Sequence, residues 1–174
     1  MIGRAAKDCG VFAVGLERDW DRTKVGHARS QLGKEYGFGI VPMTVDSRSL
    51  VGLPMFDVVI CFSVLHHVIR HQGMEEGREF LKSLASITGK CFLFDMCSPE
   101  ETANDPEWGN VLSFLRGNVV DKTAQLLWNA GFSKVTHIAD TPGYVAPGIR
   151  PMFICEPPAV SRTPGDRMPS SVPV

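Results

Sequence analysis

The sequence predicts an α/β fold, a doubly wound and mainly parallel sheet that ends in an antiparallel pair of strands. Apolar runs of strand length alternate with stretches whose apolar residues recur at helical spacing, which is typical of β-α-β units. The run Val58–Phe62 is continuously apolar, as in a strand buried on both faces. The last two runs, 134–139 and 151–155, flank a loop rich in proline and glycine. Because this loop is too short for a crossover helix, we expect the two strands to be antiparallel.

A β-α-β unit is predicted ahead of the Val58–Phe62 strand. Strand signals lie at 11–16 and 40–45. Pro42 favours an edge position for the second strand, because proline has no N–H to donate to a neighbour. Between the two runs, four apolar residues recur at helical spacing: Val25, Ala28, Leu32 and Tyr36.

Two helices with a strand between them are predicted after residue 73. The first helix covers about 74–87, and the strand is Cys91–Met96. The second helix opens at Asn118, a good N-cap residue, and Gly131 suits the position just past its end. The apolar residues that define the two helices are Phe80, Leu81, Leu84 and Ile87 in the first, and Val120, Ala124, Leu127 and Trp128 in the second.

The length and composition predict one globular domain with a tail. The chain has 174 residues, 44% of them hydrophobic and 21% charged. We assign the domain to 1–156. The segment 157–174 holds five of the twelve prolines and shows no apolar periodicity, so we expect it to be disordered.

Charge, hydropathy and cysteine spacing exclude several classes of function. A net charge of -1 gives no electrostatic reason to expect a nucleic-acid partner. No apolar run approaches the roughly 20 residues of a membrane span, and the N-terminus lacks a signal-peptide core, so we expect a cytoplasmic protein. Five cysteines without CxxC spacing argue against a disulfide framework and a zinc site. The oligomeric state is left open.

The segment Phe56–Val68, FDVVICFSVLHHV, carries the most functional information. Its polar residues Ser63, His66 and His67 fall where the buried strand ends. Ligands of open α/β sheets bind outside the carboxyl ends of the strands. We therefore expect the chemistry of this protein at that point.

This segment, together with the reversed last strand, resembles the class I S-adenosylmethionine-dependent methyltransferases over residues 1–156. The resemblance implies S-adenosylmethionine as cofactor and methyl transfer to an oxygen or nitrogen atom. A small-molecule acceptor is expected, because the chain has no basic patch and no extra domain. A nicotinamide-dependent oxidoreductase is a weaker alternative, since it leaves the reversed strand unexplained.

The resemblance implies a cofactor site at three places. Glu17 ends the first strand, where a carboxylate can accept hydrogen bonds from ribose hydroxyls. Asp46 and Ser47 follow the second strand and would contact adenine; an Asp that caps the next turn explains Asp46 equally well. Cys61, Phe62 and Ser63 would line the methionine side of the cofactor, although an aromatic such as Phe62 can also be a core residue. Asp57 is expected to be structural.

The histidines suggest a catalytic base. Methyl transfer to a hydroxyl or amine requires removal of a proton, and the pKa of histidine is close to neutral pH. We choose His66 for this role; the alternative is that His66 and His67 cap or pack the next turn. The spacing of His66, His67 and His71 does not favour a metal site. Trp108, in the loop after Cys91–Met96, is a candidate wall of the substrate site.

One motif of the family is absent. The glycine-rich turn G-x-G-x-G, which lets the backbone approach the cofactor, occurs nowhere in the chain. Val11–Leu16 matches the family's second strand, so we expect an N-terminally truncated methyltransferase that lacks the first, central strand. The alternative function is a non-catalytic methyltransferase-like scaffold or an inactive fragment without a complete cofactor site.

Overall fold

The computed structural model describes residues 8, 10–32, 37–102, 105, 108, 110–143 and 148–158. The chain divides into two compact units, Met1–Pro54 and Met55–Val174, and each is described by itself. The predicted helical position Tyr36 and most of the predicted tail lie outside the described residues, as do the side chains of Ala28 and Leu32.

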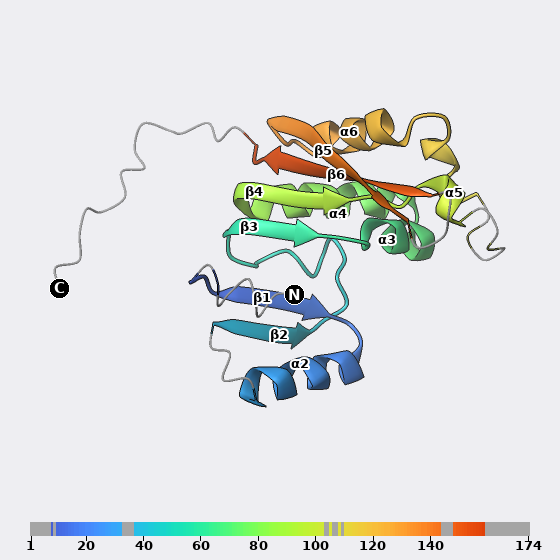
Figure 1. Cartoon of the computed structure of the whole chain (residues 1–174). Helices are drawn as coiled ribbons and strands as arrows, with labels where there is room; N and C mark the ends of the chain where they lie inside the picture. Colours follow the sequence, from blue (N-terminus) through green and yellow to red (C-terminus); the bar gives the residue numbers. More distant parts are fainter. Residues whose placement is uncertain are drawn as a thin grey trace, which may run out of the picture. The chain divides into compact units, whose positions relative to one another are not determined.

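The first unit is the predicted β-α-β unit. Strand β1 (Ala13–Glu17) is followed by helix α2 (Trp20–Leu32) and strand β2 (Phe38–Pro42), and the two strands pair in parallel (Figure 1). The carboxylate of Asp19 accepts the backbone N–H groups of Asp21 and Arg22 at 2.9 and 3.1 Å, which begins the helix and lowers the Asp19 pKa. A Cβ at Gly26 would come within 2.1 Å of Ile40, so glycine allows α2 to pack closely on β2.

The second unit is a four-stranded sheet with the order β3-β4-β6-β5. Strands β3 (Phe56–Cys61) and β4 (Thr88–Asp95) are parallel. Strand β6 (Ile149–Glu156) runs antiparallel to β4 and to β5 (Lys134–Pro142), which confirms the predicted terminal pair. Among the described strands, parallel and antiparallel pairings are equally frequent and form two separate sheets, so the prediction of one mainly parallel sheet is not met.

In the described part of this unit, five helical segments connect the strands. The long helices α4 (Met74–Ile87) and α6 (Val119–Asn129) were predicted. Asn118 caps α6 by accepting the N–H of Asp121 at 2.9 Å, and Gly131 follows the helix with φ 103°, a left-handed value that suits glycine. Helix α3 (Leu65–Gln72), the short α5 (Pro99–Thr102) and the 3₁₀ turn η1 (Ser113–Leu115) were not predicted. No helix in the described ranges is long and apolar enough to cross a membrane.

The core of the second unit lies on one face of its sheet. Phe92, Phe94 and Phe153 alternate with outward-facing neighbours and are at most 1% exposed. Phe80 of α4 and Leu127 of α6 are equally buried, and both helices lie behind the sheet in Figure 1. Residues sharing this face therefore form one continuous core.

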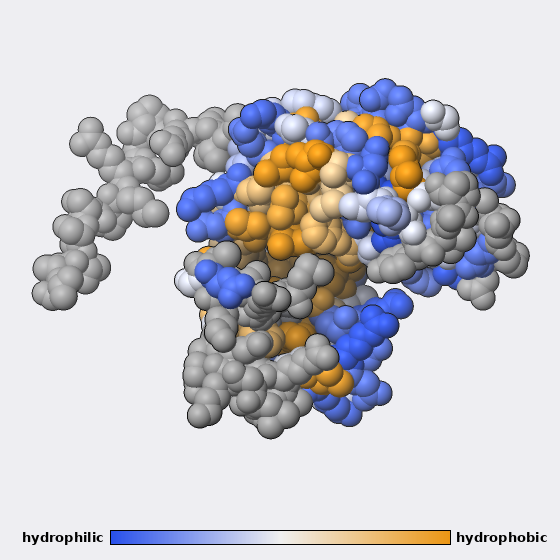
Figure 2. All heavy atoms as spheres, viewed as in Figure 1, coloured by the Kyte–Doolittle hydropathy of each residue, from blue (hydrophilic) through white to orange (hydrophobic). Residues whose placement is uncertain are grey.

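The opposite face of this sheet is open. Val58 and Ile60 of β3 are 51% and 56% exposed, and Ile154 of β6 is 38% exposed. Figure 2 shows the hydrophobic surface that results on the side turned to the viewer. The expectation that Val58–Phe62 is buried on both faces is thus wrong for this structure, and the doubly wound arrangement does not appear in the described part of this unit.

The Phe92→Ala substitution is expected to lower the free energy of unfolding by about 3–5 kcal/mol, because it leaves a cavity where the ring stacks on Phe132 at 4.8 Å. Urea denaturation measures the loss. Trp128→Ala is the matched control: this aromatic side chain of α6 is 47% exposed. Equal losses in the two variants would contradict the one-sided core.

Candidate active site at the carboxyl ends of β3 and β4

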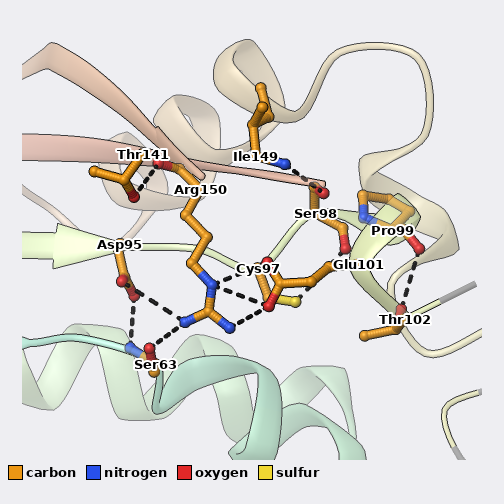
Figure 3. A network of polar contacts seen from close by, with 10 residues as sticks. All are labelled: Ser63, Asp95, Cys97, Ser98, Pro99, Glu101, Thr102, Thr141, Ile149 and Arg150. Carbon is orange, nitrogen blue, oxygen red and sulfur yellow. Dashed lines mark hydrogen bonds and ion pairs between the residues drawn. The ribbon is translucent and has the colours of Figure 1, made fainter. Parts of the chain in front are cut away.

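A buried network of polar side chains lies where β3 and β4 end and β6 begins (Figure 3). It joins four residues from four segments of the second unit: Ser63, Asp95, Glu101 and Arg150. This is the end of the sheet at which the sequence places the site, because ligands of open α/β sheets bind outside the carboxyl ends of the strands.

Ser63 forms a strained turn directly after β3. Its φ of 58° is the only positive value at a non-glycine position in the described part of the chain. For an L-residue the left-handed conformation costs roughly 1–2 kcal/mol. The Asp95 carboxylate, at the end of β4, accepts the Ser63 backbone N–H at 2.5 Å and thereby holds the turn. Burial raises the pKa of Asp95, although this hydrogen bond and the Arg150 charge both act against the shift.

Arg150 is the centre of the network. Its Nε donates to both Glu101 carboxylate oxygens at 3.0 Å, and a second guanidinium nitrogen also contacts Glu101. The third nitrogen, Nη1, donates to the Ser63 hydroxyl and lies 3.9 Å from Asp95 Oδ2. The side chains of Arg150 and Glu101 are 8% and 5% exposed. The hydrogen bonds to Glu101 raise the pKa of Arg150. One guanidinium thus ties β6 to α5 and to the turn after β3.

His66 lies in the first turn of α3 and is 3% exposed. Its Nδ1 has no hydrogen-bond partner among the described residues. Burial, reinforced by the neighbouring His67, lowers the His66 pKa to about 3, so the imidazole is neutral at pH 7. A neutral imidazole can accept a proton, but a low pKa weakens it as a base.

Trp108 is held against α3. Its ring centroid lies 5.5 Å from that of His66 and 5.3 Å from that of His67, and the Arg70 guanidinium carbon is 4.7 Å above the ring. Trp108 is 9% exposed. Contacts of this kind, which include a cation–π interaction, anchor the loop after β4 to the helix after β3.

The remaining predicted residues of the second unit lie next to this network. Cys61 is buried, and burial raises its pKa to about 12, so its thiol is protonated at neutral pH. Phe62 and Ser63 are half-buried. Asp57 lies at the start of β3 and forms an exposed ion pair with Lys90 at 3.1 Å, in agreement with a structural role.

The predicted residues of the first unit follow the ends of β1 and β2. Glu17 Oε1 accepts the Asp19 backbone N–H at 2.9 Å. The Asp46 carboxylate accepts the Ser49 N–H at 2.7 Å, and this bond lowers its pKa. Asp46 therefore caps the turn that begins at Ser47, which was the alternative explanation for this residue; a contact with adenine stays a prediction.

Sequence reasoning missed the two residues that dominate the buried network. Neither Glu101 nor Arg150 was singled out. A signal existed for Arg150, since a charged residue stands beside the apolar strand run 151–155 and a buried charge requires a partner. No comparable signal in the sequence marks Glu101. Among the described residues, no cluster of three or more His, Cys, Asp or Glu side chains could hold a metal ion.

Comparison with known proteins defines the fold. No protein-family model and no curated protein matches the sequence. Among solved structures, WbdD matches 88% of this chain with a TM-score of 0.71 and 18% identity, and the chain spans 32% of WbdD. A related WbdD structure is described as a bifunctional kinase-methyltransferase.

Two further matches hold cofactor-type ligands. Magnesium protoporphyrin IX methyltransferase (ChlM) from Synechocystis PCC 6803 with bound SAM has a TM-score of 0.58 at 13% identity, over 84% of this chain and 59% of ChlM. The N-terminal domain of EvdMO1 with SAH bound has a TM-score of 0.61 at 14% identity, over 87% of this chain and 67% of that domain. The chain has a class I methyltransferase fold. Within this methyltransferase fold, the buried Arg150 network stabilises the carboxyl end of the sheet.

Arg150→Met is expected to lower the free energy of unfolding by about 3–5 kcal/mol, because it leaves the buried carboxylates of Asp95 and Glu101 without their cation. Lys134→Met is the matched control: its ion pair with Glu156 is exposed and screened by solvent, so we expect a much smaller loss than in Arg150→Met. Urea denaturation of both variants checks this. In the double variant Arg150→Met/Glu101→Gln the loss should be smaller than the sum of the two single losses; additive losses would contradict the coupling.

The buried imidazole of His66 predicts a pH dependence of stability. Its pKa is about 3 in the folded protein, against 6.5 for an unperturbed histidine, so the unfolded chain binds the extra proton first. The stabilisation is complete above pH 6.5 and is lost as the pH falls toward 3. His66→Phe should remove a pH-dependent loss of the order of 3 kcal/mol between pH 7 and pH 4. Exposed His71→Phe is the control, and parallel pH profiles for wild type and His66→Phe would contradict the prediction.

Proposed function

We propose that this chain is the core of an S-adenosylmethionine-dependent methyltransferase that transfers a methyl group to an oxygen or nitrogen of a small-molecule acceptor. The observation that carries this proposal is the match of its fold to ChlM, a methyltransferase with bound SAM, and to an EvdMO1 domain with bound SAH; these ligands are the cofactor and its demethylated product. The chain spans about a third of WbdD and about three-fifths of ChlM, so the activity of those whole proteins is not transferred to it.

The first unit offers carboxylates for the nucleoside end of the cofactor. Glu17 stands at the carboxyl end of β1, and Oε2 of its side chain makes no hydrogen bond to another described residue. That oxygen can accept a ribose hydroxyl while Oε1 keeps its bond to the Asp19 N–H. Asp46 and Ser47, which follow β2, would contact adenine. Oδ1 of Asp46 accepts the Ser49 N–H, so we propose Oδ2 for the contact with adenine.

The second unit offers the turn after β3 for the reacting end. Phe62 and Ser63 would line the methionine side, with Cys61 beneath them as a buried, protonated thiol. Bound S-adenosylmethionine supplies a methyl group on a positively charged sulfur. The chain must then align the acceptor and accept its proton, for which His66 is the proposed base. Its lowered pKa restricts it to accepting a proton transiently, as the methyl group is transferred.

The proposed acceptor class is supported by charge alone. A net charge of -1 gives no electrostatic reason to expect a nucleic-acid acceptor. A small, uncharged or weakly charged acceptor fits this composition best.

Binding of SAH to the purified chain tests the proposed function directly, by isothermal titration calorimetry. We expect saturable binding. Glu17→Gln should weaken it by about 1–3 kcal/mol, since the amide keeps the bond to Asp19 but loses the charged acceptor. Asp21→Asn, which removes an exposed acid in the same unit, should leave the affinity unchanged. Wild-type affinity in Glu17→Gln would remove Glu17 from the cofactor site.

A non-catalytic scaffold is the second candidate, and one observation favours it. The chain holds no G-x-G-x-G turn, the motif whose backbone approaches the cofactor in this family. A scaffold would show no SAH binding at any accessible concentration while keeping the fold. The same titration therefore separates the two candidates.

A further inference from the structure

The base of the loop between β5 and β6 lies against the buried polar network. Gly143, the residue after β5, donates its N–H to the Gly148 carbonyl oxygen at 2.8 Å. The next residue, Ile149, donates its N–H to the Ser98 hydroxyl at 3.3 Å. The first bond closes the loop at its base, and the second ties that base to the segment between β4 and α5.

Gly143 has no room for a side chain. A Cβ at this position would lie 2.9 Å from Cδ of Glu101 and 2.9 Å from the Gly148 carbonyl oxygen, and closer still to Oε2 of Glu101. Real Cβ atoms do not come within 3.0 Å of other heavy atoms, so one of these groups would have to move. The φ of Gly143 is not in the left-handed range that favours glycine. The close approach to Glu101 is therefore what favours glycine here.

The Glu101 carboxylate is not free to move aside. Both of its oxygens accept hydrogen bonds from Arg150 Nε at 3.0 Å, and its side chain is only 5% exposed. Figure 3 shows the carboxylate and the guanidinium facing each other in the network. Charge-assisted hydrogen bonds of this kind depend on geometry, so a displaced carboxylate turns the guanidinium or loses these bonds. Either change reaches Ser63, because Nη1 of Arg150 donates to its hydroxyl.

We propose that Gly143 is a positioning residue for the turn at Ser63. Because it lacks a Cβ, the base of the β5–β6 loop can lie beside the Glu101 carboxylate and leave it in place. Glu101 then orients Arg150, and Arg150 holds the Ser63 hydroxyl. Ser63 is proposed to line the methionine side of the cofactor, so the use of this turn in methyl transfer rests on the proposed function.

A Cβ at Gly143 would act by one of two routes. Displacement of the Glu101 carboxylate disturbs Arg150 and the Ser63 turn. Displacement of the Gly148 carbonyl loosens the base of the loop and leaves Arg150 in place. The carboxylate oxygen is the nearer of the two groups, which favours the first route. The two routes differ in their effect on Arg150, and this difference can be measured.

Hydrogen exchange of the Arg150 Nε–H, followed by NMR, tests the starting point in the wild-type chain. Arg78 is the reference, because its ion pair with Glu75 is exposed. We expect the Arg150 Nε–H to exchange at least tenfold more slowly than the Arg78 Nε–H. Equal rates would overturn the proposal without the use of any variant.

Gly143→Ala tests the coupling. It should accelerate exchange of the Arg150 Nε–H at least fivefold and exchange of the Ser63 backbone amide at least threefold. Gly39→Ala is the matched control: a Cβ at this glycine meets no atom within 4 Å, so both rates should stay as in wild type. Wild-type rates in Gly143→Ala would overturn the proposal.

A double-mutant cycle in urea identifies the route. Glu101→Ala removes the carboxylate that the Cβ would displace, and Arg150 keeps Asp95 as a counter-charge 3.9 Å away. In this background Gly143→Ala should lower the urea midpoint by less than half as much as it does in wild type. If Gly143→Ala alone does not fold, Glu101→Ala should restore folding. Equal losses in both backgrounds, or no restored folding, would assign the strain to the loop and overturn the proposal.

Titration with SAH measures the consequence for the site. Gly143→Ala should weaken SAH binding at least threefold, and Gly39→Ala should leave it unchanged. Wild-type affinity in Gly143→Ala would overturn the positioning role. The exchange and urea measurements are made without SAH. A wild-type chain that does not bind SAH would therefore overturn the proposed function, while those measurements still decide whether Gly143 controls the Ser63 turn.

Discussion

The carboxyl end of the four-stranded sheet depends on one buried cation, the guanidinium of Arg150. Two carboxylates, Asp95 and Glu101, lie in its reach, and either would be costly to bury without a partner. The strained turn at Ser63 is held from two sides, by Asp95 at its N–H and by Arg150 at its hydroxyl. The network therefore replaces flexibility at a strand end with a defined shape, which is what a ligand site requires.

The hydrophobic stabilisation of this sheet comes almost entirely from the face that α4 and α6 cover. Phe92, Phe94 and Phe153 are buried against α4 and α6, whereas Val58 and Ile60 gain little from burial as the chain stands. Apolar area removed from water contributes about 25 cal/mol per Å², so most of the hydrophobic stabilisation of this unit comes from the helix-covered face. A core on one face is sufficient to hold the sheet together. The sequence of β3 is nevertheless apolar on both faces, although only one of its faces is buried in the core.

Local rules were enough to predict the elements with strong signals. The cap at Asn118, the glycine at 131 and the antiparallel final strands each follow from a few adjacent residues, and the structure has all three. Helix α3 has only eight residues, so its apolar pattern, Leu65, Val68 and Ile69 at helical spacing, is too short to predict a helix by itself. The Arg150–Glu101 pair joins residues 49 positions apart, and no local sequence pattern predicts such a contact. The prediction that Val58–Phe62 is buried on both faces was wrong for a related reason. The apolar composition of a strand shows that it favours burial, but it does not show whether another element packs on each face.

The register connects the open face to the buried network. Alternate residues of a strand share a face, so Asp95 continues the row of Cys91 and Leu93, and Arg150 continues the row of Ile154 on β6. The exposed apolar face thus runs along the sheet to the side chains that hold the Ser63 turn. Because charge–charge interactions strengthen where water is excluded, the burial of Asp95 and Arg150 at the end of this face strengthens the contacts that hold the turn.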